Sequence, residues 1–185
     1  MFKIGAITNR KLCENDFLEQ IRIITATDLS FLILREKDLS DREYEILAKQ
    51  VLIICKNANV PCVLHSHIEV AKTLGVNVLH LPLPELRKNK KACLMFNILG
   101  SSVHSIEEAK EAESLGATYV TAGHIFQTDC KKDLAPRGIN FLEDVVQSVS
   151  IPVYAIGGIH SDNLSKIVST NAAGACMMSD YMKYR

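Results

Sequence analysis

A histidine, His124, ends an apolar stretch and is followed within seven residues by Thr128 and Lys131. An imidazole titrates near neutral pH, so it can both accept and donate a proton. A lysine ammonium and a threonine hydroxyl are groups that bind anions. The segment is therefore a candidate site for acid–base catalysis on an anionic substrate, and the alternative is a purely structural histidine.

Two adjacent glycines, Gly157 and Gly158, follow another apolar run and precede a pattern typical of a helix start. Their amide N–H groups can approach an anion closely, and a helix N-terminus favours negative charge. Arg35 and Lys37 follow an earlier apolar run and supply fixed positive charge. These residues predict a phosphate site, whereas the alternative is a tight turn that needs glycine for a positive φ.

A third polar cluster consists of His65, Ser66 and His67. Residues two apart share one face of a strand, so the two imidazoles are placed as they are in some zinc sites. A zinc site needs further ligands, and only His80 and Glu85 lie near complementary positions. We therefore expect no metal here.

Short runs rich in aliphatic, β-branched and aromatic residues alternate with amphipathic stretches along the chain. The runs are almost continuously apolar, which is typical of parallel strands that are buried on both faces. We expect eight strands, at residues 2–8, 31–36, 61–66, 76–81, 94–100, 117–123, 152–158 and 173–179.

Helix-start signals lie between these strands. Ser40 precedes Glu43 by three residues, as in a capping box, and Ser105 opens a second clear helix that Gly116 ends. Eight strands alternating with helices over residues 1–185 predict a single α/β domain with the (β/α)8 TIM-barrel fold. A doubly wound open sheet is the alternative.

The active site of a TIM barrel lies at the carboxyl ends of its strands. This placement adds two residues to the candidate site. Ser102 follows the fifth predicted strand, and Ser179 ends the eighth. Barrels commonly bind phosphate after strands seven and eight, which places Ser179 beside the glycine pair.

The chain after the last predicted strand is short. Residues 180–185 cannot make a normal closing helix at about 1.5 Å per residue. We therefore expect a short barrel that lacks its final helix. An uncovered barrel wall favours contact with a second copy, so a homo-oligomer is expected.

Composition narrows the range of partners. Lysine plus arginine number 21 and aspartate plus glutamate number 21, so no net charge favours nucleic acid or an anionic membrane. No apolar run approaches the roughly 18 residues that a membrane-spanning helix needs, and the first residues do not read as a signal peptide. We expect a cytoplasmic protein that binds neither nucleic acid nor membrane.

Four segments resemble the thiamine phosphate synthase/TenI superfamily: LREKDLSDRE, SVHSIEEAKEAESLGATYV, GHIFQTDCKKDLAPRGI and IPVYAIGGI. Together with their spacing they cover nearly the whole chain. The motif GHxFxTDCKK is similar to that of the TenI-like thiazole tautomerases, whereas the loop of the synthases usually reads GPxFxTxTK.

The departures from the synthase pattern concern its metal and pyrimidine sites. Where synthases carry Asn-Asp-Arg after the third strand, with the aspartate binding magnesium, this chain has His65, Ser66 and His67. Ile33 replaces a glutamine that helps to hold the pyrimidine, and Pro82 begins a stretch that replaces GQxD. Magnesium-dependent condensation with a pyrimidine pyrophosphate is therefore disfavoured.

The resemblance implies a thiazole tautomerase that moves one proton on a carboxythiazole ethyl phosphate and needs no cofactor. His124 would carry the proton. The residues that would bind the substrate are Arg35, Lys37, Ser102, Thr128, Lys131, Gly157, Gly158 and Ser179. Two alternatives stay open: a thiamine phosphate synthase, and a non-catalytic regulatory protein that binds a thiamine intermediate.

Overall fold

The strands form a closed parallel barrel in a computed structural model that describes residues 1–128 and 133–184. They pair in chain order, and β8 pairs with β1 to close the ring. The predicted TIM barrel is confirmed, and the open sheet is wrong. The strands are β1 (Lys3–Ile7), β2 (Phe31–Leu34), β3 (Cys62–His65), β4 (Val78–Pro82), β5 (Ile98–Val103), β6 (Tyr119–Gly123), β7 (Val153–Ile156) and β8 (Gly174–Met177).

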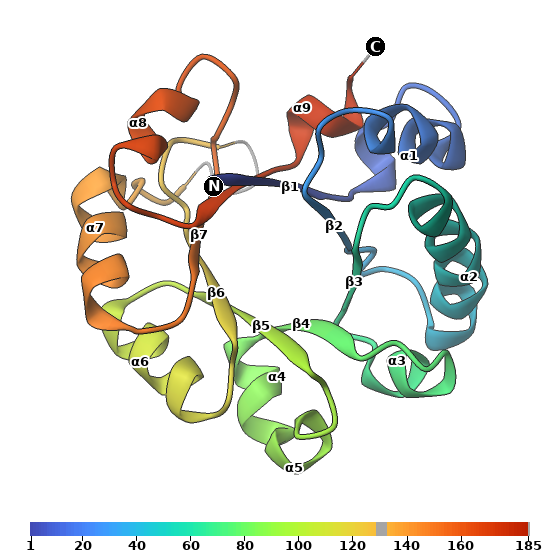
Figure 1. Ribbon diagram of the computed structural model, residues 1–185, viewed down its shortest axis with the longest axis horizontal. Coiled ribbons are helices and arrows are strands. Elements are labelled where there is room, and N and C mark those ends of the chain that lie inside the picture. Colours follow the sequence, from blue (N-terminus) through green and yellow to red (C-terminus); the bar gives the residue numbers. More distant parts are fainter. Residues whose placement is uncertain (129–132, 185) are drawn as a thin grey trace.

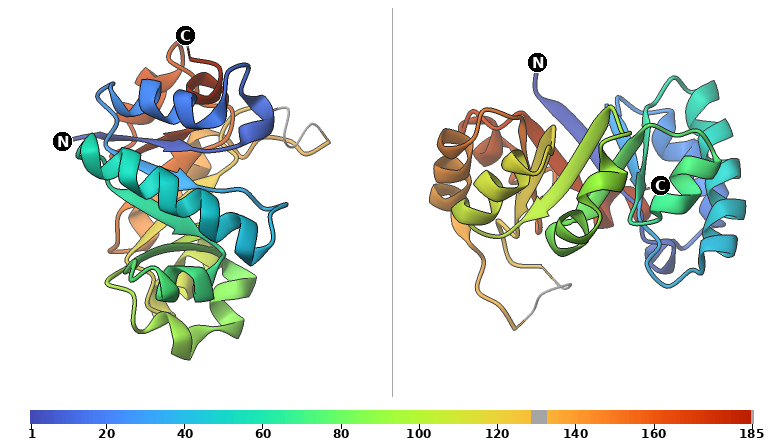
Figure 2. Two further views of the ribbon diagram at one scale, coloured as in Figure 1. Left: turned by 90° about the vertical axis from the view of Figure 1, so that its right-hand side faces the viewer. Right: turned by 90° about the horizontal axis from the view of Figure 1, so that it is seen from below.

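Helices surround the barrel, as Figures 1 and 2 show. They are α1 (Phe17–Thr25), α2 (Asp41–Asn57), α3 (Ile68–Thr73), α4 (Leu83–Lys88), α5 (Lys90–Cys93), α6 (Ile106–Ser114), α7 (Gly138–Ser148), α8 (Leu164–Val168) and α9 (Ser179–Met182), with a 3-10 turn η1 at Arg10–Leu12.

The predicted helix starts of α2 and α6 are confirmed. Ser40 and Glu43 form a reciprocal capping box at the start of α2, and Ser105 accepts a hydrogen bond from the Glu108 amide at the start of α6. These contacts satisfy amide groups that have no partner inside the helix. Gly116, with φ of 95°, follows the end of α6 as expected.

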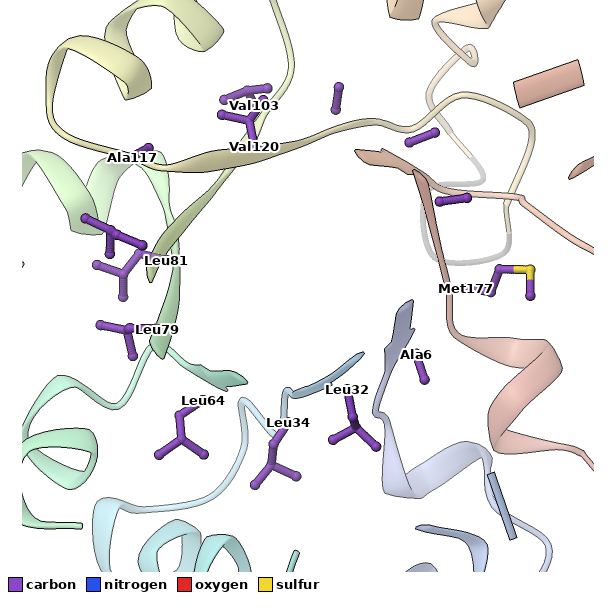
Figure 3. Close-up of a cluster of buried hydrophobic side chains, with 14 of the residues drawn as sticks. Ala6, Leu32, Leu34, Leu64, Leu79, Leu81, Val103, Ala117, Val120 and Met177 are labelled. Atoms are coloured by element: carbon purple, nitrogen blue, oxygen red, sulfur yellow. The ribbon is translucent and has the colours of Figure 1, made fainter. Parts of the chain in front are cut away.

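Alternate strand residues face two different apolar clusters. Leu32, Leu34 and Leu64 belong to the larger cluster, in which side chains point from the strands toward the helices (Figure 3). Ile33 lies between the two leucines of β2 and belongs to a smaller cluster with Tyr119 inside the barrel. Because successive side chains of a strand point to opposite faces, the continuous apolar runs bury both faces of the sheet.

The fifth strand lies further along the chain than predicted. The expected range was 94–100, but β5 is Ile98–Val103, and Leu94 and Met95 are exposed. Ser102, which was expected to follow the fifth strand, therefore lies on β5, and its side chain faces the barrel interior.

A single helical turn, α9, follows β8 in place of a full closing helix. Tyr181 and Met182 are buried there, and the Gln20 side-chain amide of α1 donates to the carbonyls of Tyr181 (2.7 Å) and Tyr184 (2.9 Å). The barrel wall is thus partly covered by the chain itself. The homo-oligomer and the cytoplasmic location stay predictions. Within residues 1–128 and 133–184, no helix has the length and apolar character needed to cross a membrane.

Candidate active site

A cavity of about 940 Å³ opens at the carboxyl ends of the strands. Its lining brings together residues that are far apart in the chain, among them nearly all of the predicted site residues. Those in the lining are Arg35, Lys37, Ser102, His124, Thr128, Gly157, Gly158 and Ser179. Lys131 lies in the segment 129–132, outside the described residues.

His124 follows the last residue of β6 and is buried. Its backbone is held by the neighbouring segment, because the Ile125 amide donates to the Ile156 carbonyl (3.0 Å) and the Phe126 amide donates to the Gly157 carbonyl (3.0 Å). Imidazole Nε2 lies 3.2 Å from the carbonyl oxygen of Leu134. Nδ1 is buried and has no hydrogen-bond partner among the described residues.

The glycine pair lies directly against this histidine segment. Gly157 has φ of 96° and Gly158 has φ of 64°, a region that side-chain-bearing residues rarely adopt. A Cβ on Gly157 would lie 2.3 Å from the Cβ of His124, and one on Gly158 would lie 2.3 Å from the carbonyl oxygen of Gln127. Turn geometry and close packing therefore both require glycine here.

The predicted helix after the glycines is confirmed, but it is short and lacks a side-chain cap. Helix α8 begins at Leu164 and has five residues, and the intervening chain is a turn. The Asn163 side chain does not cap the helix but donates to the Gly158 carbonyl (2.8 Å). Because α8 begins six residues after Gly158 and has only five residues, anion binding at Gly157 and Gly158 would depend on their own amides. No hydrogen bond between described residues uses these two amide N–H groups.

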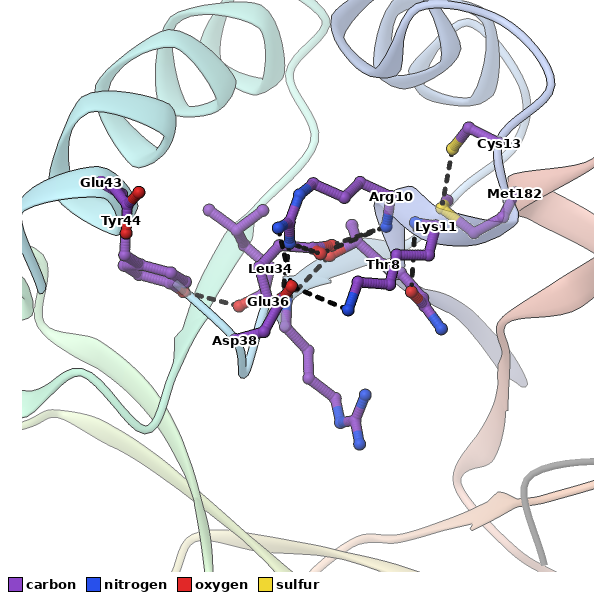
Figure 4. Close-up of polar contacts among 12 residues, drawn as sticks. Thr8, Arg10, Lys11, Cys13, Leu34, Glu36, Asp38, Glu43, Tyr44 and Met182 are labelled. Atoms are coloured by element: carbon purple, nitrogen blue, oxygen red, sulfur yellow. Dashed lines mark hydrogen bonds and ion pairs between the residues drawn. The ribbon is translucent and has the colours of Figure 1, made fainter. Parts of the chain in front are cut away.

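The loop that carries Arg35 is fixed from both sides. The Arg35 amide donates to the Thr8 hydroxyl at the end of β1 (2.9 Å). The buried Glu36 carboxylate accepts hydrogen bonds from the Arg10 backbone amide (3.1 and 3.2 Å) and guanidinium (3.0 Å). Arg10 also pairs with Asp38 through two bonds of 2.6 and 2.8 Å (Figure 4). These contacts lower the pKa of the Asp38 carboxyl well below its usual range.

His65 and His67 do not share a face. Ser66 between them has φ of 67°, so β3 ends at His65 and the chain turns. His67 stacks on Tyr44 with ring centroids 3.8 Å apart and pairs with Asp41 at 2.6 Å. His65 instead lies in the cavity lining. The i, i+2 argument for a zinc site therefore fails on the backbone conformation of Ser66.

His65 lies beside His80, with ring centroids 5.5 Å apart. Burial lowers the pKa of His65 well below its usual value, and the neighbouring His80 imidazole and the positive charges of Arg35 and Lys37 lower it further. Burial, with a smaller effect of Arg35, lowers the pKa of His80 to about 3. Both imidazoles are therefore neutral at physiological pH.

His80 is the centre of a buried polar network. Its Nδ1 lies 3.0 Å from the Tyr119 hydroxyl, and its Nε2 lies 2.8 Å from the Ser102 hydroxyl. The Thr121 hydroxyl lies 3.3 Å from that of Ser102. Sequence reasoning missed Tyr119 and Thr121. Tyr119, Thr121 and Gly123 are two residues apart on β6, so they lie on one face of the strand. This spacing could have shown that both side chains face the barrel interior.

The lining carries little carboxylate. Among the described lining residues only Asp180 has one, and it is hydrogen-bonded to the His160 imidazole and to the Ser161 amide. Within the described chain, no group of three or more His, Cys, Asp or Glu side chains is placed to hold a metal ion. Because magnesium in phosphoryl sites is bound through carboxylates, the described residues do not fit a magnesium–pyrophosphate site.

Comparison with known proteins identifies the family. Residues 4–181 match the family described as thiamine monophosphate synthase. A protein of Aquifex aeolicus named putative thiamine-phosphate synthase 2 is 33% identical over 182 residues, which is 98% of either chain. The thiamine-phosphate synthase of Syntrophomonas wolfei is 33% identical over 98% of this chain and 88% of its own.

A solved structure agrees with these matches. The thiamine phosphate pyrophosphorylase of Pyrococcus furiosus superposes with a TM-score of 0.86 at 30% identity, covering 98% of this chain and 87% of its own. The names of these relatives favour the synthase alternative over the tautomerase. The chain belongs to the thiamine monophosphate synthase family and is an enzyme of thiamine biosynthesis.

Proposed function

We propose that the chain is a thiazole tautomerase that moves one proton on a carboxythiazole ethyl phosphate, with His124 as the proton carrier. The observation that carries this proposal is the His124 imidazole, which has one buried nitrogen without a hydrogen-bond partner in residues 1–128 and 133–184 and lies in the lining of a cavity rich in cations and hydroxyls.

The contact with Leu134 assigns roles to the two nitrogens of His124. A carbonyl oxygen only accepts hydrogen bonds, so Nε2 at 3.2 Å carries the hydrogen. In the neutral imidazole Nδ1 then has the free lone pair. A buried acceptor without a partner costs about 1–3 kcal/mol, and such costs are concentrated at functional sites. Nδ1 is therefore the atom that takes the proton from one ring position and returns it to another.

The remaining lining residues suit the two anionic groups of the substrate. The amides of Gly157 and Gly158, with Ser179 close by in the lining, bind the phosphate. Arg35, Lys37 and the described hydroxyls bind the carboxylate. Lys131 is proposed for the same role on the resemblance alone. The reaction is an isomerisation, since the proton lost from the ring returns to it and no group leaves.

The synthase is the second candidate, and the names of the relatives favour it. It would require magnesium at the pyrophosphate of a pyrimidine substrate. The described lining offers only Asp180, which is already hydrogen-bonded to His160. Because the described lining has so few carboxylates for magnesium, we favour the tautomerase over the synthase.

Ring conversion with freshly generated thiazole tautomer tests the proposal. We expect His124→Asn to slow the conversion by about a hundredfold or more, the usual effect of a lost general base. The matched control is His67→Asn, because His67 lies outside the cavity lining against Tyr44. A wild-type rate equal to the spontaneous rate, with retained binding of the aromatic product, would reject catalysis and leave a binding protein.

A second assay separates the two enzymes. The protein is supplied with hydroxymethylpyrimidine pyrophosphate and thiazole phosphate, with magnesium and with a chelator. We expect no thiamine phosphate in either mixture. Magnesium-dependent product that does not require His124 would establish the synthase instead.

A further inference from the structure

The floor of the cavity contains a hydrogen-bonded chain of side chains whose direction can be worked out from its partners. Tyr119 contacts Nδ1 of His80, and Nε2 of His80 contacts Ser102. Gly100 leaves room for this chain, because a Cβ there would lie 2.1 Å from Cζ of Tyr119 and 2.4 Å from Nδ1 of His80. The contact is therefore built into the packing of β4, β5 and β6.

The Tyr119 hydroxyl sets the direction. Tyr119 is buried, and burial raises the pKa of its hydroxyl well above the usual value, so the hydrogen is retained. Among the described residues the only acceptor within reach of that hydrogen is Nδ1 of His80. A buried hydroxyl that fails to donate is costly, so Tyr119 donates and His80 accepts at Nδ1.

The tautomer of His80 follows. A neutral imidazole that accepts at one nitrogen carries its hydrogen on the other. Nε2 therefore donates to the Ser102 oxygen at 2.8 Å. The Thr121 hydroxyl also lies 3.5 Å from Nε2, but a protonated Nε2 cannot accept a hydrogen from it. Ser102 and Thr121 have two hydroxyl hydrogens and one contact between them, so one hydrogen remains to be donated into the cavity. Thr121 is 1% exposed, whereas Ser102 is partly exposed, so the donor that faces the ligand is Ser102.

We propose that Tyr119 and His80 are positioning residues that hold the Ser102 hydroxyl as a hydrogen-bond donor, so that the cavity floor selects a ligand with an acceptor oxygen such as a carboxylate. The opposite tautomer would turn Ser102 into a donor to His80 and present an acceptor to the ligand. This inference rests on the proposed function only for the identity of that ligand.

The tautomer is measured first, without any ligand, from the ¹⁵N resonances of the His80 ring in labelled protein. We expect Nε2 to be protonated and Nδ1 to be unprotonated in the wild type. In Tyr119→Phe the two resonances move toward each other, because the hydroxyl that fixes the tautomer is gone. A wild-type ring protonated at Nδ1, or resonances unchanged in Tyr119→Phe, would overturn the inference.

Calorimetric binding then tests the consequence. With the aromatic carboxythiazole ethyl phosphate we expect Ser102→Ala to weaken binding about tenfold or more, the usual effect of losing a hydrogen bond to a charged group. Tyr119→Phe should weaken it by a smaller but measurable factor of about three. Tyr154→Phe is the matched control, because that ring packs on Tyr119 at 5.6 Å and its hydroxyl makes no hydrogen bond to His80 among the described contacts.

A second ligand, the thiazole ethyl phosphate without the carboxylate, separates positioning from general structural damage. We expect Tyr119→Phe to bind this ligand as tightly as the wild type does. Equal weakening for both ligands would contradict selection of an acceptor oxygen. Because the resonance measurement uses no substrate, a failed ring-conversion assay would reject the tautomerase without affecting the assignment of His80.

Discussion

Replacing His80 by glutamine should remove a large part of the pH dependence of stability. His80 is 2% exposed, and burial lowers its pKa to about 3, against about 6.5 in an unfolded chain. The unfolded chain therefore binds a proton below pH 6.5 that the folded chain does not bind. Stability from this group is fully present above pH 6.5 and is lost as the pH falls toward 3.

The size of the effect follows from these two pKa values. Between pH 7 and pH 5 the proton occupancy of His80 in the unfolded state rises from about a quarter to almost one. At about 1.36 kcal/mol per bound proton and pH unit, the wild type loses about 2 kcal/mol through this group over these two units. His65 adds a loss in the same direction. We expect His80→Gln, which does not titrate, to lose about 2 kcal/mol less than the wild type over that range.

Urea unfolding at pH 7, 6 and 5 measures this difference. Ser102→Ala is the control, because it removes a partner of His80 but leaves the imidazole buried. It should lower stability by a similar amount at each pH and retain the steep dependence. Identical pH dependence in the wild type and His80→Gln would refute the assignment of His80 as a buried neutral group.

Two further substitutions test how the site is held. Gly158→Ala should cost at least about 1 kcal/mol through its φ of 64°. It should also weaken binding of the phosphorylated product in calorimetry, because the new Cβ meets the Gln127 carbonyl at 2.3 Å. Arg10→Ala should cost about 3 kcal/mol in urea unfolding, since the Glu36 side chain that it leaves is 2% exposed. Lys11→Ala removes an exposed ion pair and should cost less than about 1 kcal/mol.

The order of elements was readable from the sequence because both faces of a barrel strand are buried and its helices carry local capping signals. Ser40 with Glu43 and Ser105 with Glu108 act within four residues, and the structure has these contacts. The error at β5 arose from Leu94, which is apolar but exposed at 76%. Composition does not distinguish an exposed apolar turn from a buried strand.

The gathering of the candidate site was also predictable, since strand ends meet at one end of a barrel whatever their distance along the chain. The direction in which each side chain points could not be predicted from the sequence. The separation of His65 from His67 depends on the φ of Ser66, and the distance between Gly158 and the start of α8 depends on a turn that ends at Asn163. A single backbone dihedral angle does not produce a periodic pattern of apolar residues, so it cannot be inferred from the sequence.

The pairing of β1 with β8 has a consequence for the synthesis of the protein. In this pairing Lys3 lies opposite Gly174 and Ala6 lies opposite Met177. During synthesis β1 therefore cannot pair on this edge until β8, the last strand of the barrel, has left the ribosome. Until then β1 and β7 each present an unpaired edge, and open strand edges template association with other chains. The nascent polypeptide is therefore most exposed to aggregation just before its eighth strand emerges, and a ribosome that stalls after β7 releases a chain that cannot close.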